Sequence, residues 1–292
     1  MKEIKVALIQ HKYQGDRKIN LEYINKKIKE ACKSGAKLVV LPELHMSEYF
    51  CQSEDVKYFD LADYYEDDIK YFSNLAKECE IVLVTSLFEK AMEGVYFNTA
   101  IVFEKDGNIA GKYRKMHIPD DPGFYEKFYF TPGNLGFEPI NTSIGKLGIL
   151  ICWDQWFPEA ARMMALKGAQ ILIYPTAIGW FDEDSSEEKE LQLNSWIDIQ
   201  KSHAIANSVF VLSCNRVGFE KDPSGVLEGT RFWGNSFICD PRGKIQAKTN
   251  TDEEILLSRL DTSKIQDTRR IWPFFRDRRV DFYKDLNKVC DE

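Results

Sequence analysis

The sequence predicts an α/β protein, and three observations support this fold class. Apolar segments of strand length alternate with segments whose apolar residues recur every three or four positions, as in an amphipathic helix. This alternation occurs twice, as two β-α-β-α-β-β halves. No linker rich in proline, glycine or serine separates the halves, and 44% of the 292 residues are hydrophobic. We therefore expect one large core and a single domain over residues 1–292, with a C-terminal arm over about 262–292.

The first half begins with an apolar strand that follows Met1 almost directly. Its last two strands flank Lys105-Asp106-Gly107, and an Asp-Gly turn between apolar segments is a strong β-hairpin signal. The expected elements are, in order, a strand over residues 4–10, a helix with its apolar face over 21–31, a strand over 37–43, a helix near 63–79, a strand over 81–87, and strands over 97–104 and 108–113.

The second half repeats the scheme. Pro158 is typical of a first helical turn, and Gly168 is a helix stop signal. The expected elements are a strand over residues 146–152, a helix over 158–167, a strand over 170–175, a helix over about 187–207, and strands over 209–214, 232–239, 244–248 and 255–260.

Composition restricts the partners and the compartment. The net charge of −7 argues against nucleic acid or an anionic membrane as the main partner and mildly favours cationic substrates. The seven cysteines are odd in number and include no C-x-x-C pair, which favours a reducing compartment over a disulfide framework. The four histidines show no metal-binding spacing, so we expect no metal. Without a signal peptide or a membrane-spanning run, we expect a soluble, cytoplasmic protein.

Cys152 is the first candidate for a catalytic residue. It follows the apolar segment 146–151 and precedes the helix expected to begin at Pro158. A side chain at such a strand-to-helix elbow faces a cleft, beside backbone N–H groups that are free at the helix start. Most cysteines are packing residues, so a buried structural thiol is the alternative interpretation.

Two charged residues stand at comparable positions. Glu43 follows an apolar strand and Pro42, and Lys115 closely follows the strand expected over residues 108–113. Catalytic groups of α/β proteins favour the carboxyl ends of strands, where loops open a crevice. Judged singly, either residue could be an ordinary solvated charge.

Together, three motifs resemble a known family. Leu-Pro-Glu43, Tyr-Arg-Lys115-Met-His and Ile-Cys152-Trp-Asp, at separations of 72 and 37 residues, resemble the Glu-Lys-Cys triad of the nitrilase superfamily of carbon–nitrogen hydrolases. The resemblance extends from Lys5 to about Tyr283. It implies a four-layer α-β-β-α sandwich of two mixed sheets.

The resemblance also implies a mechanism. Cys152 is expected to attack an amide or ureido carbonyl while Glu43 accepts its proton. Lys115 and the backbone N–H of Trp153 are expected to stabilise the oxyanion. Glu126 lies where family members carry a second glutamate, although it could equally be a loop salt-bridge partner. No step requires a metal, nucleotide or organic cofactor.

Three neighbouring polar residues remain open to two interpretations. Asp154 could support the catalytic residues, but an acid just before a helix is also a common cap. His45 and His117 lie near the motifs in sequence. They could line the pocket, although packing roles are at least as compatible with the sequence.

The expected substrate is a small cationic ureido compound. Segments 115–133, 152–159 and 174–179 look closest to the family members that hydrolyse N-carbamoylputrescine. Relatives acting on N-carbamoyl-D-amino acids place an Arg-Arg pair after the nucleophile, where this chain has Gln155 and Trp156. An alkyl ammonium could instead lie along Trp156 and Trp180.

Asp182, or its neighbour Glu183, is the candidate partner for the ammonium at the far end of the substrate. The alternative is that these acids only precede the next helix, because Ser185-x-x-Glu188 fits a capping box.

Two other functions stay in view, namely another amidase with the same triad, such as a β-ureidopropionase or an N-carbamoyl amino acid amidohydrolase, and a non-catalytic interaction module. The tail over residues 269–283 mixes arginines with aromatic residues. Similar tails in the family cross to a second subunit, so we expect a homo-oligomer of at least two subunits rather than nucleic-acid binding.

Overall fold

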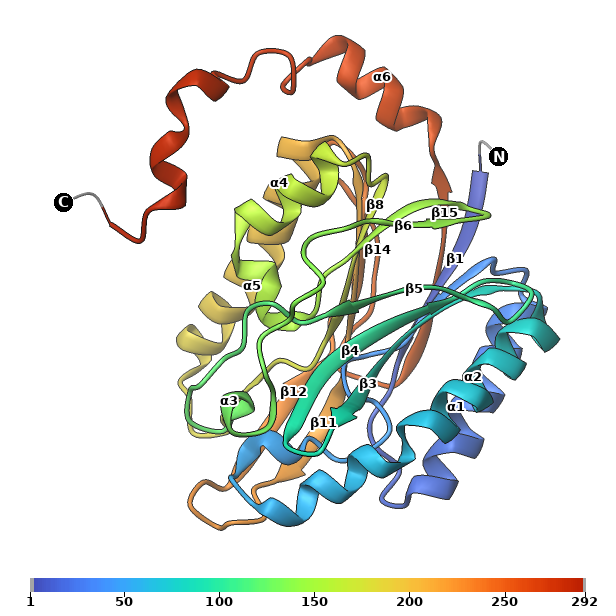
Figure 1. Ribbon diagram of the computed structural model, residues 1–292, viewed down its shortest axis with the longest axis vertical. Coiled ribbons are helices and arrows are strands. Elements are labelled where there is room, and N and C mark those ends of the chain that lie inside the picture. Colours follow the sequence, from blue (N-terminus) through green and yellow to red (C-terminus); the bar gives the residue numbers. More distant parts are fainter. Residues whose placement is uncertain (1–2, 291–292) are drawn as a thin grey trace.

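The computed structural model describes residues 3–290 and contains four layers (Figure 1). Within these residues, two six-stranded mixed sheets pack face to face. Helices α1 (Arg17–Lys33) and α2 (Tyr65–Cys79) cover the outer face of the first sheet, and α4 (Pro158–Leu166) and α5 (Ser186–Asn207) cover that of the second. This arrangement confirms the α/β class and the sandwich of two mixed sheets.

The first sheet has its parallel strands at its centre. β1, β2 and β3 run parallel to one another, and antiparallel strands extend the sheet on both sides. In spatial order, the strands are β15 (Glu254–Asp261), β1 (Glu3–Gln10), β2 (Leu38–Val40), β3 (Val82–Met92), β4 (Val95–Phe103) and β5 (Ile109–Arg114).

The second sheet repeats this pattern of directions. β7, β8 and β10 are parallel, and the remaining strands pair antiparallel. In spatial order, the strands are β14 (Ile245–Lys248), β13 (Phe237–Cys239), β10 (Phe210–Asn215), β8 (Ile171–Thr176), β7 (Gly145–Ile149) and β6 (Ile140–Thr142).

The alternation of side chains between the two faces of β1 explains why the strands appear in the sequence as continuous apolar segments. Val6 and Leu8 pack between the sheets, whereas Ala7 and Ile9 pack against α1 and α2. Successive side chains of a strand point to opposite faces, and both faces of this sheet are covered. The consecutive residues Val6, Ala7, Leu8 and Ile9 are therefore all buried in apolar surroundings.

The expected strand over residues 232–239 is wrong, because the chain changes sheets there. The structure has β12 (Gly229–Trp233), which pairs with β11 (Val217–Lys221) and β9 (Gly179–Trp180) in a small third sheet, and separately β13 in the second sheet. Gly234 and Asn235 lie between β12 and β13 with φ of 60° and 54°. Left-handed backbone cannot continue a strand, and glycine and asparagine tolerate it best.

The other differences are at the ends of elements, in short helices and in the short strands β6, β9 and β11, which were not expected from the sequence. The helix expected near 63–79 begins at Tyr65, after the 3₁₀ helix η2 (Val56–Tyr64), and another 3₁₀ turn, η1 (Phe50–Gln52), precedes it. The strand expected over 146–152 ends at Ile149. Cys152 instead begins a 3₁₀ helix, η3 (Cys152–Trp156).

The C-terminal segment leaves β15 through α6 (Ser263–Ile271) and then runs along the outside of the molecule, with two short turns, η4 (Val280–Phe282) and η5 (Lys284–Asn287) (Figure 1). It contacts the helices of the second sheet, because the Arg162 guanidinium of α4 lies 5.0 Å from the centre of the Phe275 ring. Within residues 3–290, no helix combines the length and apolar character required to cross a bilayer.

Candidate active site

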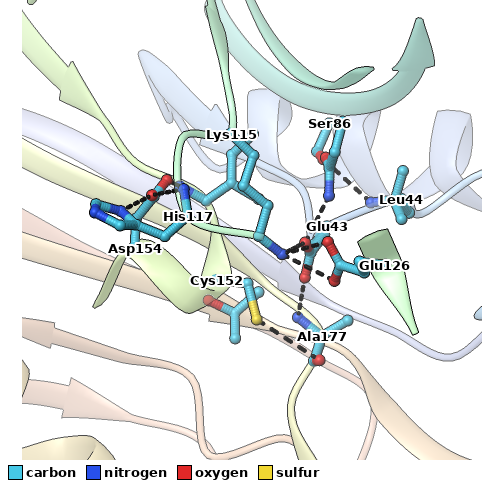
Figure 2. Close-up of polar contacts among 12 residues, drawn as sticks. Glu43, Leu44, Ser86, Lys115, His117, Glu126, Cys152, Asp154 and Ala177 are labelled. Carbon is cyan, nitrogen blue, oxygen red and sulfur yellow. Dashed lines mark hydrogen bonds and ion pairs between the residues drawn. The ribbon is translucent and has the colours of Figure 1, made fainter. Parts of the chain in front are cut away.

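Glu43 lies in the connection that leaves the carboxyl end of β2, and it is fully buried. Its Oε1 accepts hydrogen bonds from Asn98 Nδ2 of β4 and from Lys115 Nζ, both at 2.7 Å. Its Oε2 accepts from the backbone N–H of Ala177 at 2.9 Å, which links the two sheets (Figure 2). Three donors from three different segments thus hold this carboxylate in one orientation.

Lys115 lies between two buried carboxylates. Its Nζ donates to Glu43 and, at 2.8 and 2.7 Å, to both oxygens of Glu126 on the short helix α3 (Glu126–Tyr129) (Figure 2). Burial alone would lower the Lys115 pKa, but the charges of Glu126 and Glu43 outweigh it and raise the pKa well above its ordinary value. Lys115 is therefore a fixed cation. Glu126 is thus a salt-bridge partner of Lys115, a residue of the predicted site, so the two interpretations of Glu126 are compatible.

Glu43 and Glu126 share one cation, Lys115, which cannot compensate two negative charges. This affects the pKa of Glu126. Burial raises the Glu126 pKa from 4.5 to about 7, and the charge of Glu43 adds to the effect, while Lys115 and the Tyr49 hydroxyl oppose it. Tyr49 donates its hydroxyl hydrogen to Glu126 Oε1 at 2.7 Å. Glu126 is thus able to change its protonation near neutral pH.

Cys152 occupies a strained elbow. Its φ is 41°, in the left-handed region that only glycine adopts readily, and the side chain is almost completely buried. Its Sγ lies 3.8 Å from the carbonyl oxygen of Ala177 (Figure 2). Burial, followed by the charge of Glu43, raises the Cys152 pKa well above its ordinary value, although Lys115 opposes the shift. The resting residue is therefore a thiol.

Asp154 stabilises the backbone turn that carries Cys152. Its carboxylate accepts the Ile151 backbone N–H at 2.9 Å and the Tyr113 hydroxyl at 2.8 Å. On its other oxygen it accepts the His117 backbone N–H at 3.0 Å, and His117 Nδ1 lies 2.7 Å from the same oxygen. Asp154 thereby joins the turn that carries Cys152 to the segment that follows Lys115. His117 belongs to this contact, and His45 is buried elsewhere, against Phe72.

A cavity of about 600 Å³ opens beside Cys152. Its buried lining residues include Glu126, Cys152 and Ala177. One face of α5, which carries Glu188, Leu191, Gln192 and Ser195 at helical spacing, lines another wall. Its aromatic lining comprises Phe124, Trp153, Trp156, Trp180, Phe181 and Trp233.

The structure brings most of the predicted site residues together. Trp153, Trp156 and Trp180 line the cavity, as Glu126 and Cys152 do. Gln155 does not line it, because the Gln155 side chain is buried and accepts a hydrogen bond from Trp196 Nε1 at 2.8 Å. Of the two residues Gln155 and Trp156, Trp156 is therefore the one that lines the cavity.

Asp182 requires a correction. Its carboxylate forms a two-pronged ion pair with Arg231 at 2.6 Å on the surface, and it does not line the cavity. Ser185 accepts the Glu188 backbone N–H at 3.1 Å, so this segment does cap α5, as the alternative interpretation held. Besides Glu126, the acids that line the cavity are Asp121, Asp184 and Glu188, of which Asp121 and Glu188 are exposed and Asp184 is half-buried.

Three residues of the site were not predicted from the sequence. Tyr49 and Asn98 bond the two glutamates, and Ala177 contributes its N–H to Glu43 and its carbonyl to Cys152. Ala177 lies in the 174–179 segment that already resembled the family. Tyr49 and Asn98 carry no local signal, because only the tertiary structure brings them to the carboxylates.

Comparison with known proteins identifies the family. A model described as carbon-nitrogen hydrolase matches residues 5–270. The chain belongs to this family. It is therefore an enzyme that hydrolyses carbon–nitrogen bonds of amides.

Two sequence relatives are equally similar to this carbon–nitrogen hydrolase. An N-carbamoylputrescine amidase of Oryza sativa subsp. japonica is 41% identical over 288 residues, covering 97% of this chain and 94% of the relative. A citrullinase of Francisella tularensis subsp. tularensis is 41% identical over 293 residues, covering 98% and 99%. Similarity to named relatives thus leaves the substrate open.

A solved structure agrees closely with the fold. The carbon-nitrogen hydrolase of Helicobacter pylori is 56% identical, with a TM-score of 0.98, and the match covers 99% of this chain and all of that one. Within residues 3–290, no group of three or more His, Cys, Asp or Glu side chains is arranged to hold a metal ion.

Proposed function

We propose that this hydrolase cleaves N-carbamoylputrescine to putrescine, carbon dioxide and ammonia, a step of polyamine synthesis. The observation that carries the proposal is the charge of the cavity. Cys152 and Glu126 are the buried part of its lining, whereas the acids Asp121 and Glu188 are exposed and Asp184 is half-buried. Among the lining residues of the described chain, none is Lys, Arg or His. Such a cavity suits a substrate with a neutral ureido end and a cationic far end.

The chemistry begins with the thiol. Cys152 Sγ attacks the ureido carbonyl carbon, and Glu43 accepts the thiol proton as the C–S bond forms. The hydrogen bonds described among residues 3–290 include none from Cys152 to Glu43, so we expect this contact to form when substrate binds, as catalytic contacts often do. General-base assistance fits a thiol whose pKa is raised rather than lowered.

The oxyanion that forms needs donors already in place. Lys115 is a fixed cation, and the Trp153 N–H lies in the first turn of η3, where helical N–H groups lack intrahelical acceptors. Glu43 then returns its proton to the departing ammonia, which leaves a carbamoyl thioester. Glu43 next removes a proton from water, which attacks the thioester carbonyl carbon, and Glu43 returns that proton to the Cys152 sulfur as the C–S bond breaks. The carbamate released decays to putrescine and carbon dioxide.

The far end of the substrate decides between the two named activities of the relatives. Carbamoylputrescine ends in an ammonium, whereas citrulline carries an α-carboxylate next to its ammonium. Asp184 and Glu188 can each approach a cation, and Trp156 and Trp180 can cover the alkyl chain and attract the ammonium through their ring faces. A buried α-carboxylate would meet these acids without a cationic partner. The lining therefore favours the diamine derivative.

A substrate panel tests the proposal. We expect kcat/KM for carbamoylputrescine to exceed that for citrulline and for carbamoyl-β-alanine by about 100-fold or more, because a mispaired buried charge costs several kcal/mol. Ammonia release at equal enzyme concentration measures this ratio. Equal or faster turnover of citrulline would assign the citrullinase activity instead.

Replacing individual acids by their carboxamides tests which of them binds the ammonium of the substrate. Asp184→Asn and Glu188→Gln should raise KM for carbamoylputrescine with little change in kcat, since these groups are distant from the bond that is cleaved. Asp182→Asn is the control, because its carboxylate pairs with Arg231 outside the cavity. If only the control raised KM, the ammonium partner would be Asp182 after all.

A further inference from the structure

Arg216 is a buried arginine at the carboxyl end of the second sheet. It directly follows β10, is 2% exposed, and has its guanidinium 5.4 Å from the centre of the Phe232 ring. A buried guanidinium is costly unless each donor finds an acceptor. Its partners therefore indicate what it holds in place.

The partners belong to the loop that follows Glu43. Arg216 Nη2 donates to the carbonyl oxygens of Leu44 and Ser47, at 2.8 and 2.9 Å. Leu44 has a φ of 45°, a conformation that non-glycine residues adopt only when their surroundings enforce it. Arg216 thus clamps a strained residue directly next to Glu43.

Glu220 completes the clamp. It lies on β11 and accepts from Arg216 Nη1 with both oxygens, at 2.9 and 3.1 Å. Glu220 Oε2 also accepts the backbone N–H of Tyr49 at 2.5 Å. The Tyr49 hydroxyl in turn donates to Glu126. One ion pair therefore holds both ends of the loop over residues 44–49, beside Glu43 at one end and Glu126 at the other.

We propose that Arg216 and Glu220 are positioning residues for both active-site carboxylates. The ion pair fixes the loop over residues 44–49, and the loop orients Glu43 directly and Glu126 through Tyr49. This inference rests on the proposed hydrolysis, in which Glu43 transfers every proton. Loosening the clamp should impair the chemical step more than substrate binding, because neither residue lines the cavity.

The test uses two conservative variants. Glu220→Gln places an amide donor against either Arg216 or the Tyr49 N–H, so one contact must break. Arg216→Lys keeps the charge but lacks the planar fork that reaches a carboxylate and two carbonyls together. We expect either variant to lower kcat by about 10- to 100-fold while KM changes much less.

A double-mutant cycle separates positioning from general loss of stability. Tyr49→Phe removes the bond to Glu126, so Glu220→Gln and Tyr49→Phe together should lower kcat by less than the product of the two single losses. Ile28→Val, a core change on α1, controls for stability. The proposal is overturned if kcat of Glu220→Gln stays within about twofold of this control, or if the two losses simply multiply.

A measurement without substrate separates this proposal from the proposed function. The rate at which iodoacetamide alkylates Cys152, mapped by mass spectrometry, depends on how Glu43 and Lys115 face the thiol. If the wild-type enzyme turned over no ureido compound, the proposed function would fail. The alkylation rate of Glu220→Gln would then still decide whether the clamp orders the site, an unchanged rate arguing against it.

Discussion

The two sheets share one plan of strand order and direction but contribute different chemistry. In each, two pairs of parallel neighbours lie at the centre and antiparallel strands flank them. The first sheet supplies the charged groups, Glu43 after β2 and Lys115 after β5. The second supplies the thiol of Cys152 after β7 and the backbone groups of Ala177 after β8.

Equivalent places in the two sheets have opposite roles. The connection that leaves β1 begins with His11, and the one that leaves the matching strand β7 carries Cys152. His11 is buried with its Nδ1 2.9 Å from the Lys12 carbonyl oxygen, and burial lowers its pKa to about 4. A chemically versatile residue at a strand end is thus not sufficient for a site. The opposing sheet must also bring groups to meet it.

Removing the thiol should have the largest effect. Cys152→Ala should reduce kcat by about 10⁴-fold or more, because no other group can form the covalent intermediate. Unfolding temperature should change little, since the thiol makes one weak polar contact. Ammonia release and thermal unfolding measure the two effects. Activity close to wild type would end the assignment of Cys152 as nucleophile.

Iodoacetamide labelling adds a second readout on the nucleophile. The structure shows Cys290 exposed and the other cysteines buried or partly so, which means that Cys290 would react in any background. The comparison therefore uses a Cys290→Ser protein. We expect label at Cys152 before the remaining cysteines, and a product analogue should protect it.

Replacing His11 should change pH dependence rather than catalysis. The His11 pKa is lowered from 6.5 to about 4 in the folded state, so between these pH values the unfolded chain binds more protons than the native one. The free energy of unfolding therefore falls as pH drops through this window, by up to about 3 kcal/mol from His11. His11→Gln lacks this titration.

Urea unfolding at several pH values checks the His11 expectation. The His11→Gln protein should show a shallower decrease in unfolding free energy between pH 6.5 and 4, with kcat at pH 8 close to wild type. A slope equal to that of wild type would mean that His11 does not titrate in this way. A large loss of kcat would mean that the β1 end also belongs to the site.

The C-terminal segment is a third difference between the two halves. Of the changes considered, its removal should affect activity least. Its contacts with the second half include Arg162 over Phe275, Arg242 over Trp272, and Arg269, which donates to the Asn207 carbonyl at 3.2 Å. Trp272 and Phe282 remain 42% and 69% exposed. We propose that a second copy of the chain covers these aromatic residues in a homo-oligomer.

Light scattering tests this arrangement. The full chain should be a dimer or larger at micromolar concentration, and a chain that ends at Ile271 should have a smaller assembly size. Carbamoylputrescine turnover should change little, because the segment does not line the cavity. A monomeric full-length chain, unchanged by the truncation, would contradict the proposal.

The sequence alone determined the fold class and the order of most elements, and it predicted the Glu43, Lys115 and Cys152 set. Period and length of the apolar segments indicate strands and helices because both faces of each large sheet are covered. The motifs containing the three residues are short and local, so their order and spacing could be compared with a family directly. The strand predicted over 232–239 failed because two left-handed residues, rather than a loss of apolar character, divide it.

Only the tertiary structure decided which neighbours complete the site. Tyr49, Asn98 and Ala177 reach the carboxylates from segments far apart in the chain. Asp182, Asp184 and Glu188 are indistinguishable as acids in the sequence, yet Arg231 neutralises the first at the surface and the others line the cavity. Hydrogen bonds and ion pairs between distant segments depend on the positions of donor and acceptor atoms to within a few tenths of an ångström. Residue type and local pattern carry no such information.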